Sequence, residues 1–466
     1  MGIKNSSAAK AGVGYTVGNI LVKGINFLSL PIFSRLMTTD EFGIYNVFVS
    51  YEAILTLIVG FAMHSSLRSA NVDYKGKIDE YTSSISIVYI FSALGMTCIA
   101  FAMRDFLTKI LSFSFNIIIL LILYSFGSAI LTLYNERIGI EYAYKNYLII
   151  ALINSLGNVF FSLLFMFTFC RENKAFGRIF GATLTIFILS VFLLSLLYRK
   201  SEPRVNDKYW KYAFTYSLPI VPHGVSQVLL AQFDRIMIRT MVSDSAAGIY
   251  SLAGNIKLIL TIITTSIATA WGNWFYESME RKETKQIQYR SIQLMVLFTI
   301  LSIGLMAVSP EMILILGGKN YEVAKYVAIP MIMDAFILFI YNVIVQAEYY
   351  MKKTSYIMIG TIVAAAIDIV ANYIFIQKYG YIAAAYTTLF AYICYLALHL
   401  LISRKLVGFS ILPGKWLVFF AGLVILIGVV DLVFIEYIGI RFLVCIITVM
   451  PMFFSLIKYL RGTKKK

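Results

Sequence analysis

Residues 110–135 read ILSFSFNIIILLILYSFGSAILTLYN and contain no charged side chain. A helix of about 20 apolar residues can cross the roughly 30 Å hydrocarbon core of a bilayer. Stretches of this kind recur along all 466 residues, of which 60% are hydrophobic and only 14% are charged. A soluble protein is nearer to half apolar and a quarter charged. The sequence therefore predicts an all-α polytopic membrane protein.

Apolar windows bounded by charged or turn-forming residues divide the chain into about fourteen predicted transmembrane helices. The connections between them are short, which leaves no room for a soluble catalytic domain. The first span is not typical of a cleavable signal peptide, because its apolar run is too long and contains Lys23. The predicted spans are 12–33, 43–64, 81–103, 110–135, 146–169, 177–198, 213–233, 247–270, 291–316, 326–350, 355–377, 380–402, 416–435 and 438–460.

The Lys and Arg residues are distributed unequally between the connections on the two sides of the membrane. With the N-terminus inside, the inside segments contain 26 Lys and Arg residues and the outside segments contain 12. Because positive residues favour the cytoplasmic side, we expect both termini in the cytoplasm. Most of the net charge of +16 is then a topology signal, and the basic tail is expected to lie near anionic membrane lipids. Nucleic acid is not an expected partner.

Two segments about 205 residues apart are alike. Residues 35–45 read RLMTTDEFGIY and residues 239–250 read RTMVSDSAAGIY. Each closes a helix with Arg, makes a polar turn that is favourable N-cap chemistry, and opens the next helix with Gly-Ile-Tyr. Six spans separate the copies, so both halves have the same orientation. We predict two six-helix bundles, 1–208 and 209–403, related by a pseudo-two-fold axis along the membrane normal, and two additional helices in 404–466.

Polar side chains in the middle of predicted spans are candidate binding residues, because a charge at this depth usually faces a cavity or a partner. Lys23 and Lys257 lie near mid-membrane in the first and eighth spans, and a lysine can bind phosphate as a point charge. Asn19 and Asn26 share a helical face with Lys23. The alternative is that each lysine pairs with a buried carboxylate.

Several carboxylates in predicted spans are candidates for charge switching or ion coupling. Glu52 precedes Lys257 by 205 residues, the repeat distance. We predict that Glu52 neutralises a lysine in the empty protein or carries a proton; a fixed ion pair that sets bundle packing is the alternative. Asp334, Asp368 and Asn372 in the second half are candidates for binding a coupling ion, H⁺ or Na⁺. The sequence shows no metal-ligand cluster and no nucleophile–base spacing.

His223 and Gln227 lie one turn apart just after two prolines, which should kink the seventh span or leave carbonyl groups unpaired. Discontinuous helices often mark binding sites in transporters, so both residues are candidate substrate-binding residues. A histidine bonded to a freed carbonyl group is the alternative. His64 and His399 lie near the ends of predicted spans and are expected to be interfacial.

Short motifs near the ends of the spans resemble the oligosaccharide flippases of the multidrug/oligosaccharidyl-lipid/polysaccharide exporter superfamily. The resemblance covers the whole chain in span number and length. The motifs are Leu30-Pro31-Ile32, Arg35-Leu36, Phe42-Gly43-Ile44-Tyr45, Ser217-Leu218-Pro219-Ile220-Val221-Pro222, Phe233-Asp234-Arg235, Gly248-Ile249-Tyr250-Ser251 and, more weakly, Asn372-Tyr373-Ile374-Phe375-Ile376 with Lys378-Tyr379-Gly380.

This resemblance implies a transporter and not an enzyme. The expected activity is translocation of undecaprenyl-pyrophosphate-linked oligosaccharide repeat units across the bacterial plasma membrane by alternating access, for O-antigen (lipopolysaccharide) or capsule assembly. Partners would be a polysaccharide polymerase and glycosyltransferases, and no cofactor is implied.

Three other functions are alternatives, and a feature of the sequence opposes each of them. A cation-coupled multidrug exporter is opposed by the mid-membrane lysines, because a cation site should be net acidic. A peptidoglycan lipid-precursor flippase should have a more cationic cavity. A membrane polymerase or glycosyltransferase usually needs a large extramembrane loop, and the short connections leave no room for one.

Overall fold

The computed structural model describes residues 2–463, with side chains described for residues 14, 18 and 21–454. Within this range the backbone forms helices joined by short turns, and no strand occurs. The prediction of an all-α membrane protein is therefore confirmed. The chain divides into two compact units, Met1–Ile236 (unit 1) and Met237–Lys466 (unit 2).

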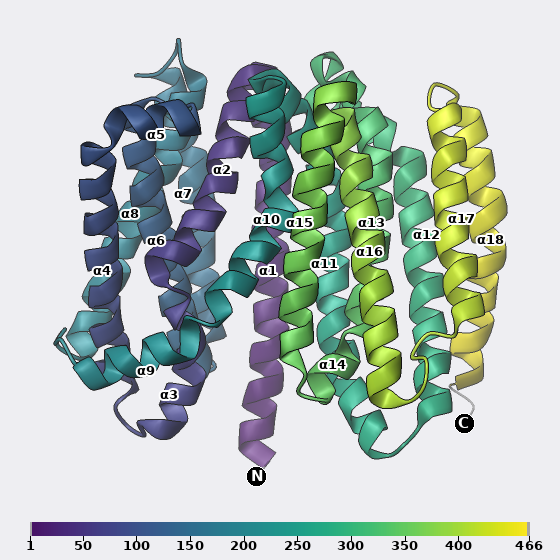
Figure 1. Ribbon diagram of the computed structural model, residues 1–466, viewed down its shortest axis with the longest axis horizontal. Coiled ribbons are helices and arrows are strands. Elements are labelled where there is room, and N and C mark those ends of the chain that lie inside the picture. Colours follow the sequence, from purple (N-terminus) through teal and green to yellow (C-terminus); the bar gives the residue numbers. More distant parts are fainter. Residues whose placement is uncertain (1, 464–466) are drawn as a thin grey trace. The chain divides into compact units, whose positions relative to one another are not determined.

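Unit 1 is built from long helices with short helices between them (Figure 1). The long helices are α1 (Gly2–Leu36), α2 (Thr39–Gly60), α4 (Ile78–Ala102), α6 (Phe115–Ile140), α7 (Tyr144–Phe167) and α8 (Lys174–Lys200). The short helices are η1 (Met63–Ser66), α3 (Leu67–Asp73), α5 (Arg104–Leu111) and α9 (Asp207–Ser217). The next long helix, α10 (Ile220–Met241), contains the boundary between the units.

Unit 2 is also built from long helices with short helices between them. It includes residues 404–466, the segment predicted to follow the second bundle. Its helices are α11 (Asp244–Glu280), α12 (Thr284–Gly317), η2 (Lys319–Ala324), α13 (Lys325–Ile344), α14 (Gln346–Tyr350), α15 (Thr354–Tyr379), α16 (Ile382–Val407), α17 (Gly414–Val433) and α18 (Ile438–Thr463). Both α17 and α18 pack against α12, so the additional pair is part of this unit.

Ion pairs tie the additional helices to the rest of unit 2. Nζ of Lys325, at the start of α13, lies 2.6 Å from Oε1 of Glu436 in the α17–α18 turn. This hydrogen-bonded ammonium group holds the pKa of Glu436 below its usual value. Nη2 of the buried Arg441 lies 2.5 Å from Oε1 of Glu311 on α12. The α17–α18 pair is therefore held by charge as well as by apolar packing.

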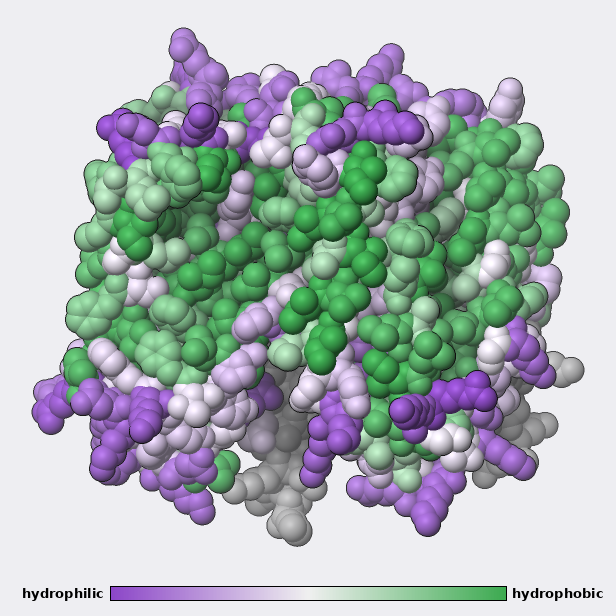
Figure 2. Space-filling view, in the orientation of Figure 1, coloured by the Kyte–Doolittle hydropathy of each residue, from purple (hydrophilic) through white to green (hydrophobic). Residues whose placement is uncertain are grey.

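Each of the fourteen predicted spans overlaps one long helix. Within the described residues, eleven helices are long and apolar enough to cross a membrane. In each unit, apolar side chains form a broad middle zone and polar side chains gather at the helix ends (Figure 2). The apolar part of α18 is shorter, Ile438–Phe454, and α10 is not among the eleven because it carries the polar residues His223, Gln227, Gln232, Asp234, Arg235 and Arg239.

The predicted kink of the seventh span takes the form of a break between two helices. The structure ends α9 at Ser217 and begins α10 at Ile220. Pro219 lies in the turn between them, and Pro222 lies in the first turn of α10, where the backbone nitrogen has no intrahelical partner to lose. The prolines therefore separate two helices, and the span begins at 220, after the predicted 213.

The repeated motif forms the same structure in each unit, a helix end followed by a capped helix start. The Thr38 hydroxyl accepts a hydrogen bond from the Glu41 backbone N–H (3.2 Å), and the Glu41 carboxylate accepts one from the Thr38 N–H (2.9 Å). This reciprocal pair is a capping box at the start of α2. The Ser243 hydroxyl caps α11 by accepting a hydrogen bond from the Ala246 backbone N–H (3.1 Å), which corresponds to the first of these two bonds. The polar part of the repeat is therefore explained by helix capping.

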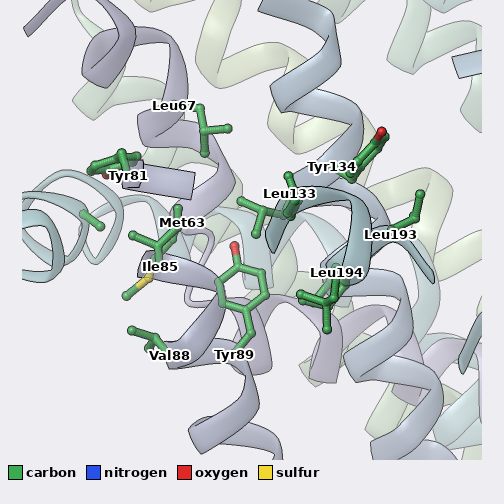
Figure 3. Close-up of a cluster of buried hydrophobic side chains, with 14 of the residues drawn as sticks. Met63, Leu67, Tyr81, Ile85, Val88, Tyr89, Leu133, Tyr134, Leu193 and Leu194 are labelled. Carbon is green, nitrogen blue, oxygen red and sulfur yellow. The ribbon is translucent and has the colours of Figure 1, made fainter. Parts of the chain in front are cut away.

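The core of unit 1 is an apolar cluster in which α4, α6 and α8 meet η1 and α3 (Figure 3). Tyr89, Leu133 and Leu193 are fully buried in it. Lipid chains are as apolar as these side chains, so close packing stabilises the cluster more than removal from water does. The Tyr81 and Ser66 hydroxyl groups share a 2.6 Å hydrogen bond, which removes the cost of burying them.

Close packing of α7 on α8 depends on Gly181. A Cβ atom at this position would lie 2.5 Å from the backbone of Phe161 and Ser162, and backbone atoms cannot rotate away. We expect Gly181→Ala to lower the free energy of unfolding by about 1–3 kcal/mol, as overpacking does elsewhere. Denaturant unfolding in detergent measures this. Gly95→Ala, where nothing lies within 4 Å, is the control; equal losses in both variants would contradict the role of Gly181.

Candidate functional site

A buried ion pair joins the middle of α11 to the middle of α13. Nζ of Lys257 lies 2.5 Å from Oδ1 of Asp334. The Asp334 side chain is 1% exposed, whereas that of Lys257 is 21% exposed. Nζ also lies 5.4 Å from the ring centre of Tyr392 on α16, within the range of a cation–π contact. Lys257 therefore has the buried carboxylate partner that the sequence left open as an alternative.

The pair follows from the packing of α11 against α13. Asp334 is the tenth residue of α13, so it lies at mid-helix and not near the outer end. An isolated charge at this depth is costly, and each residue offsets the other. The neutralisation of a lysine by Glu52 stays a prediction; within unit 1, Glu52 accepts a 2.8 Å hydrogen bond from Thr56.

Glu52 lines a cavity of about 320 Å³ inside unit 1. Its carboxylate is hydrogen-bonded by the hydroxyl groups of Thr56 and Ser128. His64, which was expected to be interfacial, lines the same cavity. The cavity places a carboxylate and an imidazole beside hydroxyl groups in an otherwise apolar wall. Its remaining lining residues are Ala53, Leu57, Gly60, Tyr89, Ala129, Thr132 and Val228.

A cluster of oxygen atoms lies between α15 and α16. Asp368 and Asn372 are fully buried one turn apart on α15. The Thr388 hydroxyl donates to Oδ1 of Asp368 (3.1 Å), and the Thr387 hydroxyl donates to Oδ1 of Asn372 (2.5 Å). The two α15 residues were predicted from the sequence, but the two threonines were not, because only the packing of α15 on α16 brings the four side chains together. Carboxylate, amide and hydroxyl oxygens are ligands that hard cations prefer.

The structure describes the side chains of only some of the candidate residues on α1. Lys23 and Asn26 are both exposed, and Lys23 forms no ion pair with any described residue. The backbone carbonyl of Asn26 accepts a hydrogen bond from Ser29 (2.7 Å). The side chain of Asn19 lies outside the described residues. The role of this face as a phosphate site stays a prediction.

The two candidates on α10 differ in exposure. Gln227 is exposed, whereas His223 is half-buried and its Nδ1 has no hydrogen-bond partner among the residues that the structure describes. The predicted alternative, a bond from the histidine to a freed carbonyl group, is not seen at Nδ1; the nearby carbonyl of Pro222 accepts a hydrogen bond from Ser226 (2.8 Å). The Nδ1 atom of His223 is therefore a buried polar atom without a hydrogen bond in the described part of the chain.

Solved structures of known proteins share this fold. The lipid II flippase MurJ in its inward closed conformation matches with a TM-score of 0.76 and 14% identity, over 96% of this chain and 99% of that one. An inward-facing multidrug resistance MATE family transporter of the MOP superfamily matches with a TM-score of 0.65 and 13% identity, over 84% and 94%. At these identities the likeness is one of fold alone.

Sequence comparisons point to glycan assembly. The probable low-salt glycan biosynthesis flippase Agl15 of Haloferax volcanii is 22% identical over 84% of this chain and 82% of its own length. Lsg locus putative protein 1 of Haemophilus influenzae is 22% identical over 75% and 86%. Residues 9–279, more than half of the chain, match the family described as polysaccharide biosynthesis protein. The chain is thus an all-helical membrane protein of the polysaccharide biosynthesis protein family.

Proposed function

We propose that this protein translocates undecaprenyl-pyrophosphate-linked oligosaccharide repeat units across the bacterial plasma membrane by alternating access, for O-antigen or capsule assembly. Both termini would lie in the cytoplasm. The family and its flippase relatives support a transporter of lipid-linked glycans. The observation that carries the finer proposal is Lys257, a mid-helix cation balanced by one buried carboxylate.

The Lys257–Asp334 pair supports a binding step by anion exchange. A pyrophosphate carries more charge than a carboxylate and can take the place of Asp334 beside the ammonium group. Asp334 would then be a buried carboxylate without its cation, which is costly until it takes up a proton. Headgroup binding at Lys257 and proton binding at Asp334 would therefore favour each other. In unit 1, His223, Gln227 and the exposed Lys23 and Asn26 stay proposed substrate-binding residues in their own right.

Two other places are proposed for coupling the transport cycle to an ion. The cluster of Asp368, Asn372, Thr387 and Thr388 supplies four oxygen-bearing side chains for Na⁺ or a carboxylate for H⁺. Glu52 in its cavity is the candidate in unit 1. Because the carboxylate of Asp368 is fully buried, binding of a cation there removes an electrostatic cost.

A vesicle assay with three cargoes tests the proposal. Purified protein is reconstituted, and translocation is followed for a fluorescent undecaprenyl-pyrophosphate oligosaccharide, for lipid II and for a cationic drug. We expect clear translocation of the first cargo, with lipid II at or near the protein-free background. Transport of the drug with no movement of the oligosaccharide would replace the proposal by the exporter function. Equal rates for the two lipids would make the peptidoglycan precursor the cargo to pursue.

A further inference from the structure

A second buried acid–base pair lies in unit 2, away from Lys257. Oε1 of Glu348 on α14 lies 2.6 Å from Nδ1 of His399 on α16. Both side chains are fully inaccessible to solvent. His399 lies near a helix end, as expected, and its ring is covered by neighbouring helices. The candidate functions above make no use of this pair.

Aromatic rings enclose the pair. The His399 ring meets the rings of Tyr341 (5.0 Å between centroids) and Tyr395 (4.6 Å) edge-on. On α15, Thr361 shares a 2.9 Å hydrogen bond with the Tyr395 hydroxyl. The other titratable neighbour on α14 is Tyr349, whose electrostatic interaction with Glu348 is repulsive only when the phenol is ionised. Exposed phenols titrate near pH 10, so at physiological pH these neighbours are neutral.

The elements packed around α14 supply no competing ion pair. On α11 the titratable neighbour is Tyr276, whose ring lies 5.4 Å from that of Tyr350. Lys352 and Lys353 follow α14 in an exposed turn, and only the backbone N–H of Lys353 contacts Glu348, at its carbonyl oxygen (2.9 Å). Within the described residues, neither lysine forms an ion pair with Glu348. His399 is thus the one ion-pair partner of Glu348 in that part of the chain.

The second polar atom of each partner is unsatisfied. Oε2 of Glu348 and Nε2 of His399 are buried and have no hydrogen-bond partner among the described residues. With one shared proton the pair is net neutral, whichever atom holds it. Gaining or losing a proton would leave a net charge in an apolar, aromatic surrounding, which is strongly disfavoured. The packed pair therefore retains one proton.

The pair sits on an element that can move. Helix α14 has five residues and follows α13 at Val345, where the backbone stays helical but Glu348 N–H donates to the Val345 carbonyl three residues before it. The Trp271 indole N–H donates to the carbonyl of Val343 beside this junction (2.9 Å). On the other side, the chain turns at Lys352, which has a left-handed backbone (φ 56°). A short helix between this junction and a turn can separate from α16 without unfolding its long neighbours.

We propose that Glu348 and His399 form a proton-binding site that ties docking of α14 on α16 to the uptake of one proton. In water above about pH 6.5, glutamate is ionised and histidine is mostly neutral, so the undocked pair holds no proton. Docking then takes up one proton, and a rise in pH favours undocking. The sign follows from linkage: the state that binds more protons loses population as pH rises, by up to about tenfold per pH unit. Between about pH 4.5 and 6.5 both states hold one proton and the equilibrium is flat.

This site goes beyond the proposed function and does not depend on its cargo. The end of unit 2 that carries it is predicted to face the cytoplasm, where the pH is higher than outside many bacteria. Undocking of α14 would then release a proton on that side. Proton binding by Glu348 and His399 would be a step of the transport cycle whichever lipid headgroup binds at Lys257.

Hydrogen–deuterium exchange of the full chain in nanodiscs tests the site without any cargo. The readout is the opening constant of residues 341–353, corrected for the intrinsic pH dependence of amide exchange. We expect the constant to rise up to about a hundredfold from pH 6.5 to pH 8.5. Glu348→Gln keeps a hydrogen-bond acceptor for His399 but removes the acid, and we expect a constant independent of pH. His399→Gln leaves the buried acid in place, so docking should still take up a proton and the pH dependence should persist.

Gly360 provides an independent variant that leaves both partners in place. A Cβ atom on Gly360 would lie 2.3 Å from Nε2 of His399, so Gly360→Ala should displace the imidazole from Glu348, weaken docking and raise the opening constant at every pH. Gly304→Ala, with nothing within 4 Å, should keep the wild-type slope. A wild-type opening constant that does not change with pH, or a wild-type slope retained in Glu348→Gln, would overturn the proton site. If Glu348→Gln does not fold, the pH dependence of the wild-type opening constant decides.

Discussion

Replacing Lys257 with alanine is expected to abolish translocation of the oligosaccharide and to destabilise unit 2 at the same time. The substitution removes the ammonium group that lies 2.5 Å from Asp334 and leaves that carboxylate buried with its main cation missing. Loss of one partner of a buried pair costs about 3–5 kcal/mol. Loss of a charged contact to the headgroup costs a further 1.5–3 kcal/mol or so of binding energy. Unfolding in detergent measures the first effect and the vesicle assay measures the second.

The double variant Lys257→Ala/Asp334→Ala separates the two effects. Removing both charges takes away the buried unpaired carboxylate, so most of the lost stability should return. Translocation should stay absent, because the headgroup still has no cation at this position. Lys378→Ala, at an exposed position on α15, is the control that should change neither quantity. Wild-type translocation by the double variant would mean that Lys257 only neutralises Asp334, and the pyrophosphate site would have to lie elsewhere.

The apolar pattern was sufficient to predict the spans, but it could not place every helix end. The number of long helices follows from stretches such as 110–135, since each must satisfy its own backbone hydrogen bonds in lipid. The start of that helix was missed because Ser112 adopts a left-handed conformation (φ 52°) and separates α5 from α6. The start of α10 was missed for a similar reason, a turn within an apolar stretch. Turns of this kind depend on the backbone conformation of single residues, which a hydropathy pattern does not predict.

The candidate site was predictable in its residues but not in its contacts. The depth of Lys257 in its span could be read from the sequence, because depth is set by position along one helix. Its partner Asp334 is 77 residues further on, and only the packing of α11 on α13 shows that the two meet. The repeat drew attention to Glu52 and not to Asp334, because it relates equivalent positions and does not show which side chains pack together. His399 was missed as a buried residue because its burial depends on Glu348 and on the Tyr341 ring, which come from other helices.

Replacing Asp368 with asparagine is expected to uncouple transport from its driving ion. Asparagine has nearly the same shape and still offers an oxygen to the Thr388 hydroxyl, 3.1 Å away in the native protein. It cannot offer the negative charge that binds Na⁺ or H⁺. We therefore expect the accumulation of cargo driven by an imposed ion gradient to fall to the equilibrium ratio of about 1, while slow equilibration across the vesicle membrane continues. Stability should hold or rise, because a buried charge is removed.

The same vesicle assay, run with an imposed Na⁺ or pH gradient, measures this effect and identifies the ion. Asp431→Asn is a matched control, because Asp431 is also a fully buried carboxylate of unit 2 but lies on α17, outside the oxygen cluster. Thr388→Val removes one hydroxyl oxygen at similar volume and should weaken the ion dependence by about 10–100-fold, as loss of a supporting group does at other ion sites. A gradient response that survives Asp368→Asn but not Glu52→Gln would move the coupling site to the cavity of unit 1. The two halves would then divide the work differently, with headgroup binding in unit 2 and ion binding in unit 1.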